Sequence, residues 1–256
     1  MKTSTQFVQD MYALKVRHIL SVPVTAGNQA DVVKAVFGFA LKAQSVYVCV
    51  ANVHMVVEAV KNKKLFSVIQ NAALVVTDGM PLVWELKHQG VGQIERVPGP
   101  DLMVSVCEEA QQIRLPVYFF GGSKKTSFLL EKNLKKRFPD LEIAGCEPPP
   151  MLPELPILDQ MLIGRIRDSG ARIVFVGLGC PKQEYWMSEY AKHLPAVLIG
   201  VGAAFDFFAG TKKRAPLWMQ NSGLEWLFRL FSEPRRLWKR YFFTNILFIW
   251  YRLRGI

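Results

Sequence analysis

The residue best placed for acid–base chemistry is Asp78, in the stretch VVTDGMPLVWEL. It follows an apolar run, residues 72–77, that predicts a buried strand, and Gly79 and Pro81 after it favour a sharp turn into a helix. A carboxylate at the end of a parallel strand faces the crevice where such sheets bind ligands, and there it can act as a general base. The alternative is that Asp78 only caps the following helix.

Asn52 occupies the same kind of position, because it follows a predicted strand, residues 45–51, and begins the next helix. Its amide can hydrogen-bond a sugar hydroxyl or an acetamido group, or it can simply cap the helix. His54, two residues later, is a further candidate for acid–base catalysis, although a single histidine on a helix is more often structural. The two positions together favour a polar site at one edge of the sheet.

Two glycine turns are candidates for holding phosphate groups. Gly121 and Gly122 follow a predicted strand, residues 116–120, and precede a helix whose first backbone amides can cradle a diphosphate. The string GLGCPK, residues 177–182, begins like a dinucleotide-binding fingerprint. However, Lys182 stands where a third glycine is needed, and no acidic residue follows about 20 positions later. The sequence therefore argues against a nicotinamide cofactor.

The most unusual string is GCPKQEYW, residues 179–186. Pro181 starts a helix, and we expect Gln183 and Glu184 in its first turn to face the crevice. A polar pair there suits recognition of sugar or base hydroxyls. The alternative for Glu184 is that its charge stabilises the start of the helix.

The motifs of several other enzyme classes are missing. The sequence has no Asp-x-Asp, His-Glu-x-x-His, Walker lysine loop or Gly-x-Ser-x-Gly. Its four cysteines lie far apart without a Cys-x-x-Cys pair, which indicates reduced thiols and neither a zinc site nor a disulfide framework. We therefore expect no metal and no cofactor. A departing diphosphate would then be stabilised by arginines and helix dipoles.

Alternating short apolar runs and amphipathic segments position these residues. The predicted strands are residues 45–51, 72–77, 116–120, 141–145, 172–177 and 196–201. The predicted helices are residues 53–63, 81–88, 101–113, 124–138, 157–168 and 183–193. This pattern predicts an α/β fold with a Rossmann-like, doubly wound, mostly parallel sheet over residues 1–210, interrupted by a proline-rich connector at residues 147–156.

Residues 211–256 differ from the rest of the chain and predict a helical C-terminal appendage. They hold ten of the 32 Lys and Arg residues and 11 of the 30 aromatic residues. We expect two helices there, with Pro234 at the start of the second. The apolar run 241–251 is shorter than the roughly 20 residues that span a bilayer, so it predicts a helix lying on an anionic membrane surface. The alternative is packing on the core or on another subunit.

The ordered set of motifs resembles the WecG/TagA/CpsF glycosyltransferases over about residues 15–245. The strings that carry the resemblance are VVTDG (75–79), ERVPG (95–99), FGG (120–122), GLGCPKQE (177–184), GVG (200–202), RAP (214–216) and GLEW (223–226), together with Asn52. The resemblance implies an inverting transfer from a UDP-sugar to a polyprenyl-diphosphate-linked saccharide in cell-envelope or exopolysaccharide biosynthesis. The donated sugar stays open between N-acetylmannosamine, its uronic acid and glucose.

By the same resemblance, Asp78 falls on the catalytic base and Arg96 on a substrate-contacting position. The candidate substrate-binding residues are then Asn52, Gly79, Arg96, Gly121, Gly122, Gly179, Pro181, Gln183 and Glu184. The candidate diphosphate-stabilising residues are Arg214, Arg229, Arg236 and Lys239, the last standing where another arginine is expected. Val50 replaces a threonine that members often carry.

The implied location is the inner face of a bacterial plasma membrane, because residues 1–20 lack the uninterrupted apolar stretch of a signal peptide. A homo-oligomer is compatible with the sequence. Two other classes of protein share some of these sequence features. The sheet pattern also fits a nucleotide-dependent oxidoreductase, against which the broken glycine fingerprint speaks. The basic, aromatic appendage also fits a nucleic-acid-binding module, but its apolar run suits a lipid surface better, so we expect no nucleic-acid partner.

Overall fold

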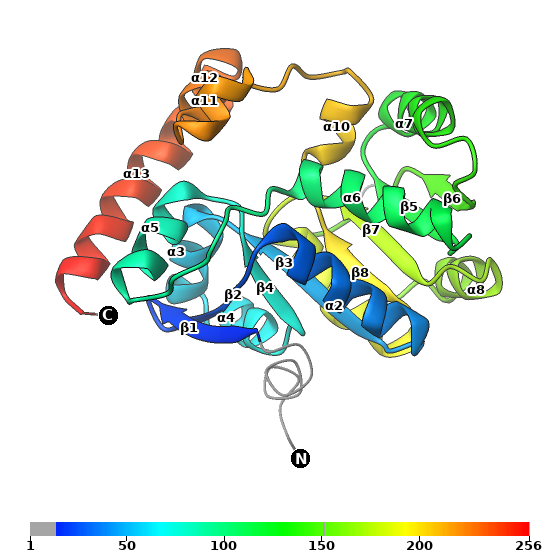
Figure 1. Ribbon diagram of the computed structural model, residues 1–256, viewed down its shortest axis with the longest axis horizontal. Coiled ribbons are helices and arrows are strands. Elements are labelled where there is room, and N and C mark those ends of the chain that lie inside the picture. The colour runs from blue at the N-terminus through cyan, green and yellow to red at the C-terminus, as the bar shows by residue number, and fades with distance from the viewer. Residues whose placement is uncertain (1–13, 151, 256) are drawn as a thin grey trace.

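The computed structural model describes residues 14–150 and 152–255 (Figure 1). Residues 1–13, which form most of the N-terminal segment that lacks a signal peptide's apolar stretch, and Met151 in the proline-rich connector lie outside the described residues. At the centre is a six-stranded sheet in the order β4-β3-β8-β7-β5-β6, and every neighbouring pair of strands is parallel. Its strands are β3 (Val46–Ala51), β4 (Leu74–Thr77), β5 (Val117–Gly121), β6 (Ile143–Glu147), β7 (Ile173–Gly177) and β8 (Val197–Gly200). The predicted α/β fold and its strands are confirmed.

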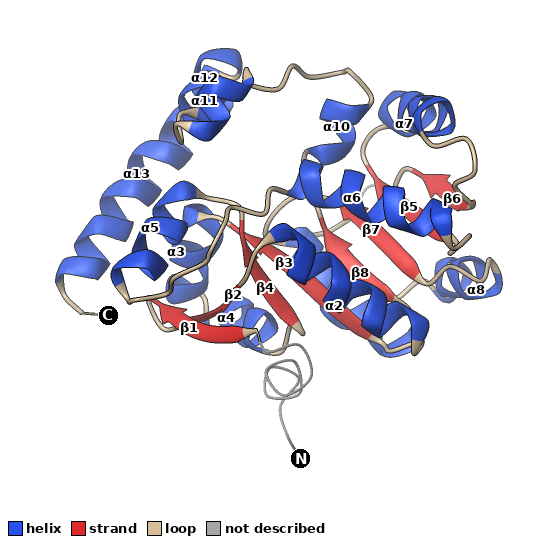
Figure 2. Cartoon of the chain, viewed as in Figure 1, coloured by secondary structure: helices blue, strands red, loops and turns tan. Residues whose placement is uncertain are grey.

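Helices cover both faces of this sheet (Figure 2). One face carries α2 (Gln29–Leu41), α6 (Gly99–Gln112), α7 (Lys124–Arg137) and α10 (Ala204–Phe208). The other carries α3 (Val53–Lys61), α4 (Lys63–Gln70), α5 (Met80–His88), α8 (Gln160–Asp168) and α9 (Lys182–Tyr190), followed by the short 3₁₀ helix η1 (Ala191–His193).

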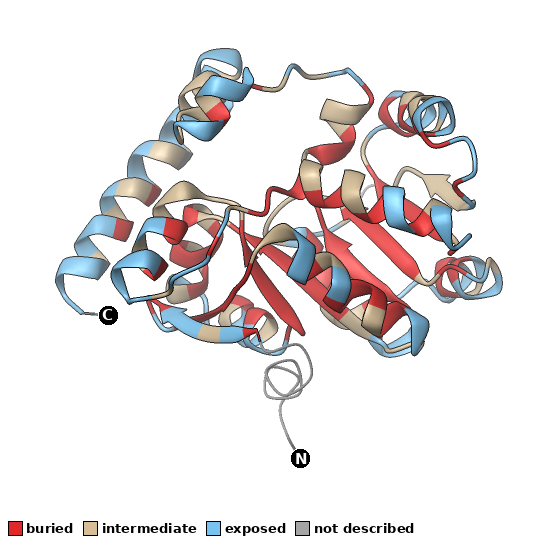
Figure 3. Ribbon diagram, viewed as in Figure 1, coloured by how far each residue is buried: buried red, intermediate tan, exposed pale blue. Residues whose placement is uncertain are grey.

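Burial on both faces explains why the strands read as continuous apolar runs. Along β3, Val48 and Val50 pack into the core on the α2 side, whereas Tyr47, Cys49 and Ala51 pack into the core on the α3 side. Figure 3 shows the strands of the sheet as mostly buried, except the edge strand β6, which is intermediate, and the exposed residues lie largely on the outer helices and loops. A strand between two helical layers has no solvent-facing side on which polar residues would alternate.

A small antiparallel hairpin, which the sequence did not predict, lies beside β4. It is formed by β1 (Lys15–Ile19) and β2 (Val22–Ala26), and the Val75 backbone N–H donates to Thr25 Oγ1 at 3.1 Å. The predicted helix 53–63 corresponds to α3, which ends at Lys61, and the sequence did not predict α4. Asn62 separates them: it ends α3, and its side chain accepts from the first amides of α4.

The appendage contains three helices, not the two predicted: α11 (Leu217–Asn221), α12 (Glu225–Ser232) and α13 (Pro234–Leu253). Pro234 does lie in the first turn of the last helix, as predicted. Helix α13 packs along α3, and Phe248 reaches the core on that face (Figure 1). No helix within residues 14–150 and 152–255 is long and apolar enough to cross a bilayer.

Candidate active site

The predicted site residues gather at the edge where the parallel strands end. Asn52 follows β3, Asp78 follows β4, and the two glycine turns follow β5 and β7. The start of α3 touches the start of α5, because a Cβ added to Gly79 would lie 3.7 Å from the Cα of Asn52. The backbone N–H of Asp78 donates to the Ala51 carbonyl at 2.7 Å, which fixes the two strand ends side by side.

Asp78 does not cap the helix that follows it. The N-cap of α5 is Gly79, and no side chain caps this helix start. The alternative reading of Asp78 as a structural cap is therefore wrong. Asn52 does cap α3, because its Oδ1 accepts from the Met55 N–H at 3.2 Å. Because the Asp78 carboxylate does not cap a helix, it is available to act in catalysis.

The pKa of Asp78 is raised to about 6, because burial, followed by the negative charge of Glu225, outweighs the effect of the nearby cations. Arg96, Arg229 and Arg214 oppose this and lower the pKa, in that order of effect. The carboxylate is thus mostly ionised at neutral pH, yet it binds a proton far more readily than an ordinary aspartate. Such a pKa suits a general base that operates near pH 7.

Arg96 is held next to the base by its own backbone neighbours. Thr77 Oγ1 donates to the Glu95 carbonyl at 3.1 Å, and the Val97 N–H donates to the Thr77 carbonyl at 2.6 Å. Two hydrogen bonds to the residue before Asp78 therefore bracket Arg96. Its guanidinium Nη1 contacts Glu225 Oε2 from the appendage at 2.7 Å.

Two of the four predicted diphosphate-binding cations lie near Asp78. Arg214 makes a two-pronged ion pair with Asp101 on α6, with Nη2 2.8 Å from Oδ2, and its Nε is buried without a hydrogen-bond partner in the described part of the chain. The guanidinium carbon of Arg229 lies 5.7 Å from the centroid of the Phe207 ring. Both arginines are close enough to lower the pKa of Asp78.

The other two cations are not among the charges that shift the pKa of Asp78. Arg236 is 52% exposed and pairs with Glu233 at the junction of α12 and α13. Lys239 is exposed, with its Nζ 5.6 Å from the centroid of the Trp238 ring. A direct role of these two at the diphosphate would require the helix pair to move or the donor to extend toward them.

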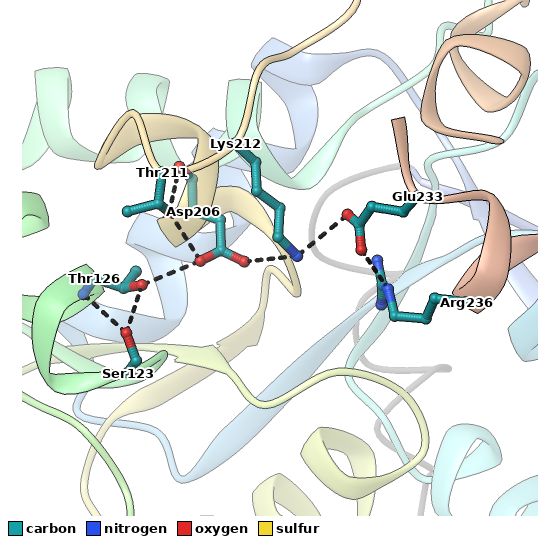
Figure 4. Close-up of polar contacts among 7 residues, drawn as sticks. All are labelled: Ser123, Thr126, Asp206, Thr211, Lys212, Glu233 and Arg236. Carbon is teal, nitrogen blue, oxygen red and sulfur yellow. Dashed lines mark hydrogen bonds and ion pairs between the residues drawn. The ribbon is translucent and has the colours of Figure 1, made fainter. Parts of the chain in front are cut away.

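A polar chain links the start of α7 to the appendage (Figure 4). Asp206 on α10 accepts from Thr126 at 3.2 Å and from Thr211 at 3.1 Å. Lys212 lies between two carboxylates, with Nζ 3.2 Å from Asp206 and 3.3 Å from Glu233. The appendage is thereby tied to the helix that follows the first glycine turn.

Gln183 and Glu184 are buried, and they organise the loops around them. Gln183 Oε1 accepts from the backbone N–H groups of Gly179 at 3.3 Å and Gly202 at 3.2 Å, and its Nε2 donates to Glu184 Oε1 at 2.7 Å. Gln183 is 4% exposed and Glu184 0% exposed. Both side chains are thus covered by the protein, contrary to the expectation that they face the crevice, and Gln183 joins the loops that follow β7 and β8. Pro181 precedes the first turn of α9, as predicted.

The two glycine turns touch each other through their backbones. A Cβ on Gly121, whose φ is +147°, would lie 2.6 Å from the Gly177 carbonyl oxygen. The Gly122 N–H donates to that same oxygen at 3.2 Å. This amide is used within the protein, so a diphosphate cradle at the turn would have to rely on other amides of the start of α7.

Potential metal ligands do not cluster in the described residues. No group of three or more His, Cys, Asp or Glu side chains there is arranged to hold a metal ion. The free cysteines Cys49 and Cys107 are buried, and burial raises the pKa of both thiols.

Residues 17–255 match the model of the Glycosyl transferase WecG/TagA/CpsF family. The chain belongs to this family. It is also 33% identical over 195 residues, covering 76% of this chain and 74% of the relative, to a Bacillus spizizenii protein named N-acetylglucosaminyldiphosphoundecaprenol N-acetyl-beta-D-mannosaminyltransferase. The protein is thus a glycosyltransferase, and the family resemblance drawn from its motifs is confirmed.

Three acidic residues of this glycosyltransferase were not predicted to belong to the site. Glu225 contacts Arg96, Asp101 pairs with Arg214, and Asp206 anchors the appendage through a lysine. Glu225 lies in the GLEW string, so the motif contained a signal, but its partner is 129 residues away in the sequence. The string RAP likewise marks Arg214 without indicating Asp101.

Proposed function

We propose that this glycosyltransferase transfers a sugar from a UDP-sugar to a polyprenyl-diphosphate-linked saccharide with inversion and without a metal ion. The observation that carries the proposal is Asp78: a carboxylate that caps no helix, lies at the carboxyl edge of a parallel sheet and has a pKa of about 6. Among the donors left open by the sequence, the name of the Bacillus spizizenii relative favours N-acetylmannosamine. The same name favours an acceptor ending in N-acetylglucosaminyl diphosphoundecaprenol.

The proposed reaction is a single displacement. The Asp78 carboxylate takes the proton of an acceptor hydroxyl as the hydroxyl oxygen forms a bond to the anomeric carbon of the donor. The bond from that carbon to the β-phosphate oxygen breaks, and UDP leaves with the electron pair. Attack opposite the leaving group inverts the anomeric configuration.

Arginines supply the charge that the leaving diphosphate needs. The positive charges of Arg96, Arg214 and Arg229 all act on Asp78. The buried Nε of Arg214 is a hydrogen-bond donor that has no acceptor among the described residues. Guanidinium groups bind phosphate oxygens in a two-pronged geometry and stabilise charge that develops as the bond breaks. This set of cations supports a mechanism that needs no bound metal.

The surface of α13 supports attachment to a membrane. Seven of its large apolar side chains remain 41–82% exposed, and they are Trp238, Phe242, Phe243, Ile246, Ile249, Trp250 and Leu253. Exposed cations, including Arg235, Arg236, Lys239 and Arg254, lie on the same helix or directly after it. Each cation near an anionic surface contributes about 1 kcal/mol, so a few of them would hold the enzyme near its lipid-linked acceptor.

The test of the proposed function is the variant Asp78→Asn. UDP release from UDP-N-acetylmannosamine, with a short-chain polyprenyl-diphosphate N-acetylglucosamine as acceptor, should fall by about 10²–10⁴-fold, while binding of UDP stays near that of the wild type. Asp140→Asn, at an exposed turn before β6, is the matched control. NMR of the product tests inversion, and EDTA tests metal independence. Near-normal turnover by Asp78→Asn would reject the proposed base.

A further inference from the structure

Glu225 is the point at which the appendage meets the catalytic edge. It is the first residue of α12, and its carboxylate contacts Arg96 at 2.7 Å. The side chains of this pair are only 14% and 15% exposed, so solvent screens them less than an ordinary surface ion pair. Gly223, two residues earlier, packs against Met80 at the start of α5, where an added Cβ would lie 3.1 Å from the methionine side chain. The appendage therefore touches the core on both sides of Asp78.

The position of Arg96 makes this contact relevant to the base. The hydrogen bonds of Glu95 and Val97 to Thr77 hold Arg96 beside the residue that precedes Asp78. Glu225 thus reaches the base through a cation that the fold has already fixed in place. The sequence motifs did not indicate a role in the site for Glu225.

The charges around Asp78 come from three parts of the chain. Arg96 belongs to the segment after α5, Arg214 to the stretch before α11, and Arg229 and Glu225 to α12. Glu225 is the negative charge that raises the pKa of Asp78, and the three arginines lower it. Without Glu225, three cations would act on the base unopposed.

We propose that Glu225 is a positioning residue of the reaction: through its ion pair with Arg96 it holds that cation in place, and it sets a second negative charge beside Asp78. This inference rests on the proposed role of Asp78 as the base. It adds that the appendage influences proton transfer as well as the donor diphosphate.

The test is the pH dependence of kcat/KM, whose acid limb reports the ionisation of the base in the free enzyme. Glu225→Gln keeps a hydrogen-bond acceptor for Arg96 and removes the charge, so the acid limb should move to lower pH by roughly 0.5–1 unit. Arg96→Gln should move it to higher pH, because it removes a cation that favours the ionised base. Glu233→Gln is the matched control on the appendage, and its acid limb should stay at the wild-type pH.

Each outcome decides between the two proposals. An acid limb that is unshifted or raised in Glu225→Gln overturns the role of Glu225, while loss of turnover in Asp78→Asn leaves the proposed function standing. Turnover by Asp78→Asn overturns the function itself. If Glu225→Gln does not fold, Arg96→Gln decides alone, since an unshifted or lowered limb there also refutes the coupling. A merely structural role for Glu225 would lower kcat without moving the limb.

Discussion

The base proposed here should destabilise the fold at neutral pH, and replacing it should stabilise the protein while abolishing turnover. The pKa of Asp78 is raised from the ordinary 3.8 to about 6. The unfolded chain therefore releases this proton at lower pH than the folded chain does. Stability falls as pH rises between these two values, and above about pH 6 the full penalty applies. Asparagine does not ionise, so Asp78→Asn removes the penalty.

The size of the effect follows from the pKa difference. The gap between 3.8 and about 6 corresponds to at most about 3 kcal/mol at pH 7.5. Part of the Asp78 side chain remains accessible to solvent, which screens its charge. We therefore expect Asp78→Asn to raise the free energy of unfolding by about 1–2 kcal/mol. For a chain of this length, each kcal/mol raises Tm by about 2–4 °C.

The assay is thermal unfolding of wild type and Asp78→Asn at pH 7.5 and pH 4.0. The variant should melt clearly higher at pH 7.5 and only slightly higher at pH 4.0, where the folded state holds the proton and the unfolded state is roughly half ionised. Asp140→Asn, on an exposed turn, should show no such pH-dependent gain. A stabilisation of equal size at both pH values, or none at pH 7.5, would refute the account of a strained, ionised base.

Four further variants test the framework around the site. Gly121→Ala should unfold or fail to accumulate as soluble protein, because its Cβ would lie 2.6 Å from the backbone oxygen of Gly177. Phe248→Ala should lower the free energy of unfolding by about 3 kcal/mol in urea titrations, as the buried ring anchors α13. Phe242→Ala, 58% exposed, should change it by less than about 0.5 kcal/mol but reduce co-sedimentation with anionic vesicles. Lys212→Met removes two partly exposed ion pairs, and it should cost about 1 kcal/mol and speed chymotryptic cleavage of the appendage.

The main elements were predictable because both faces of the sheet are covered. Most of the six central strands appeared as continuous apolar runs, and Asp78 was proposed as the base from its place directly after one of them. The hairpin was missed because its strands are short, one contains Pro23, and its turn uses Leu20 and Ser21 with φ of 48° and 66° in place of an Asn-Gly pair. Helix α4 was not predicted; Asn62 alone separates it from α3, with no glycine or proline between them.

The polar partners of the site could not be predicted in the same way. Arg96 and Glu225 are 129 residues apart, and Asp101 and Arg214 are 113 apart. The local hydrophobic pattern of the sequence cannot indicate such pairs, because they depend on where the appendage packs on the core. The burial of Glu184 was missed for a related reason: its position in the first turn of a helix gives no information on which neighbours close over it.

The strand order also sets the distance between Asp78 and the second glycine turn. Three strand spacings separate β4, which carries Asp78, from β7, which ends at the second glycine turn. At about 4.8 Å per spacing, these two points are about 14 Å apart along the sheet. An extended nucleotide sugar can bridge that interval, whereas a free monosaccharide is too short to touch both ends. The enzyme should therefore distinguish intact donor from its sugar by reach alone, before any hydroxyl is recognised.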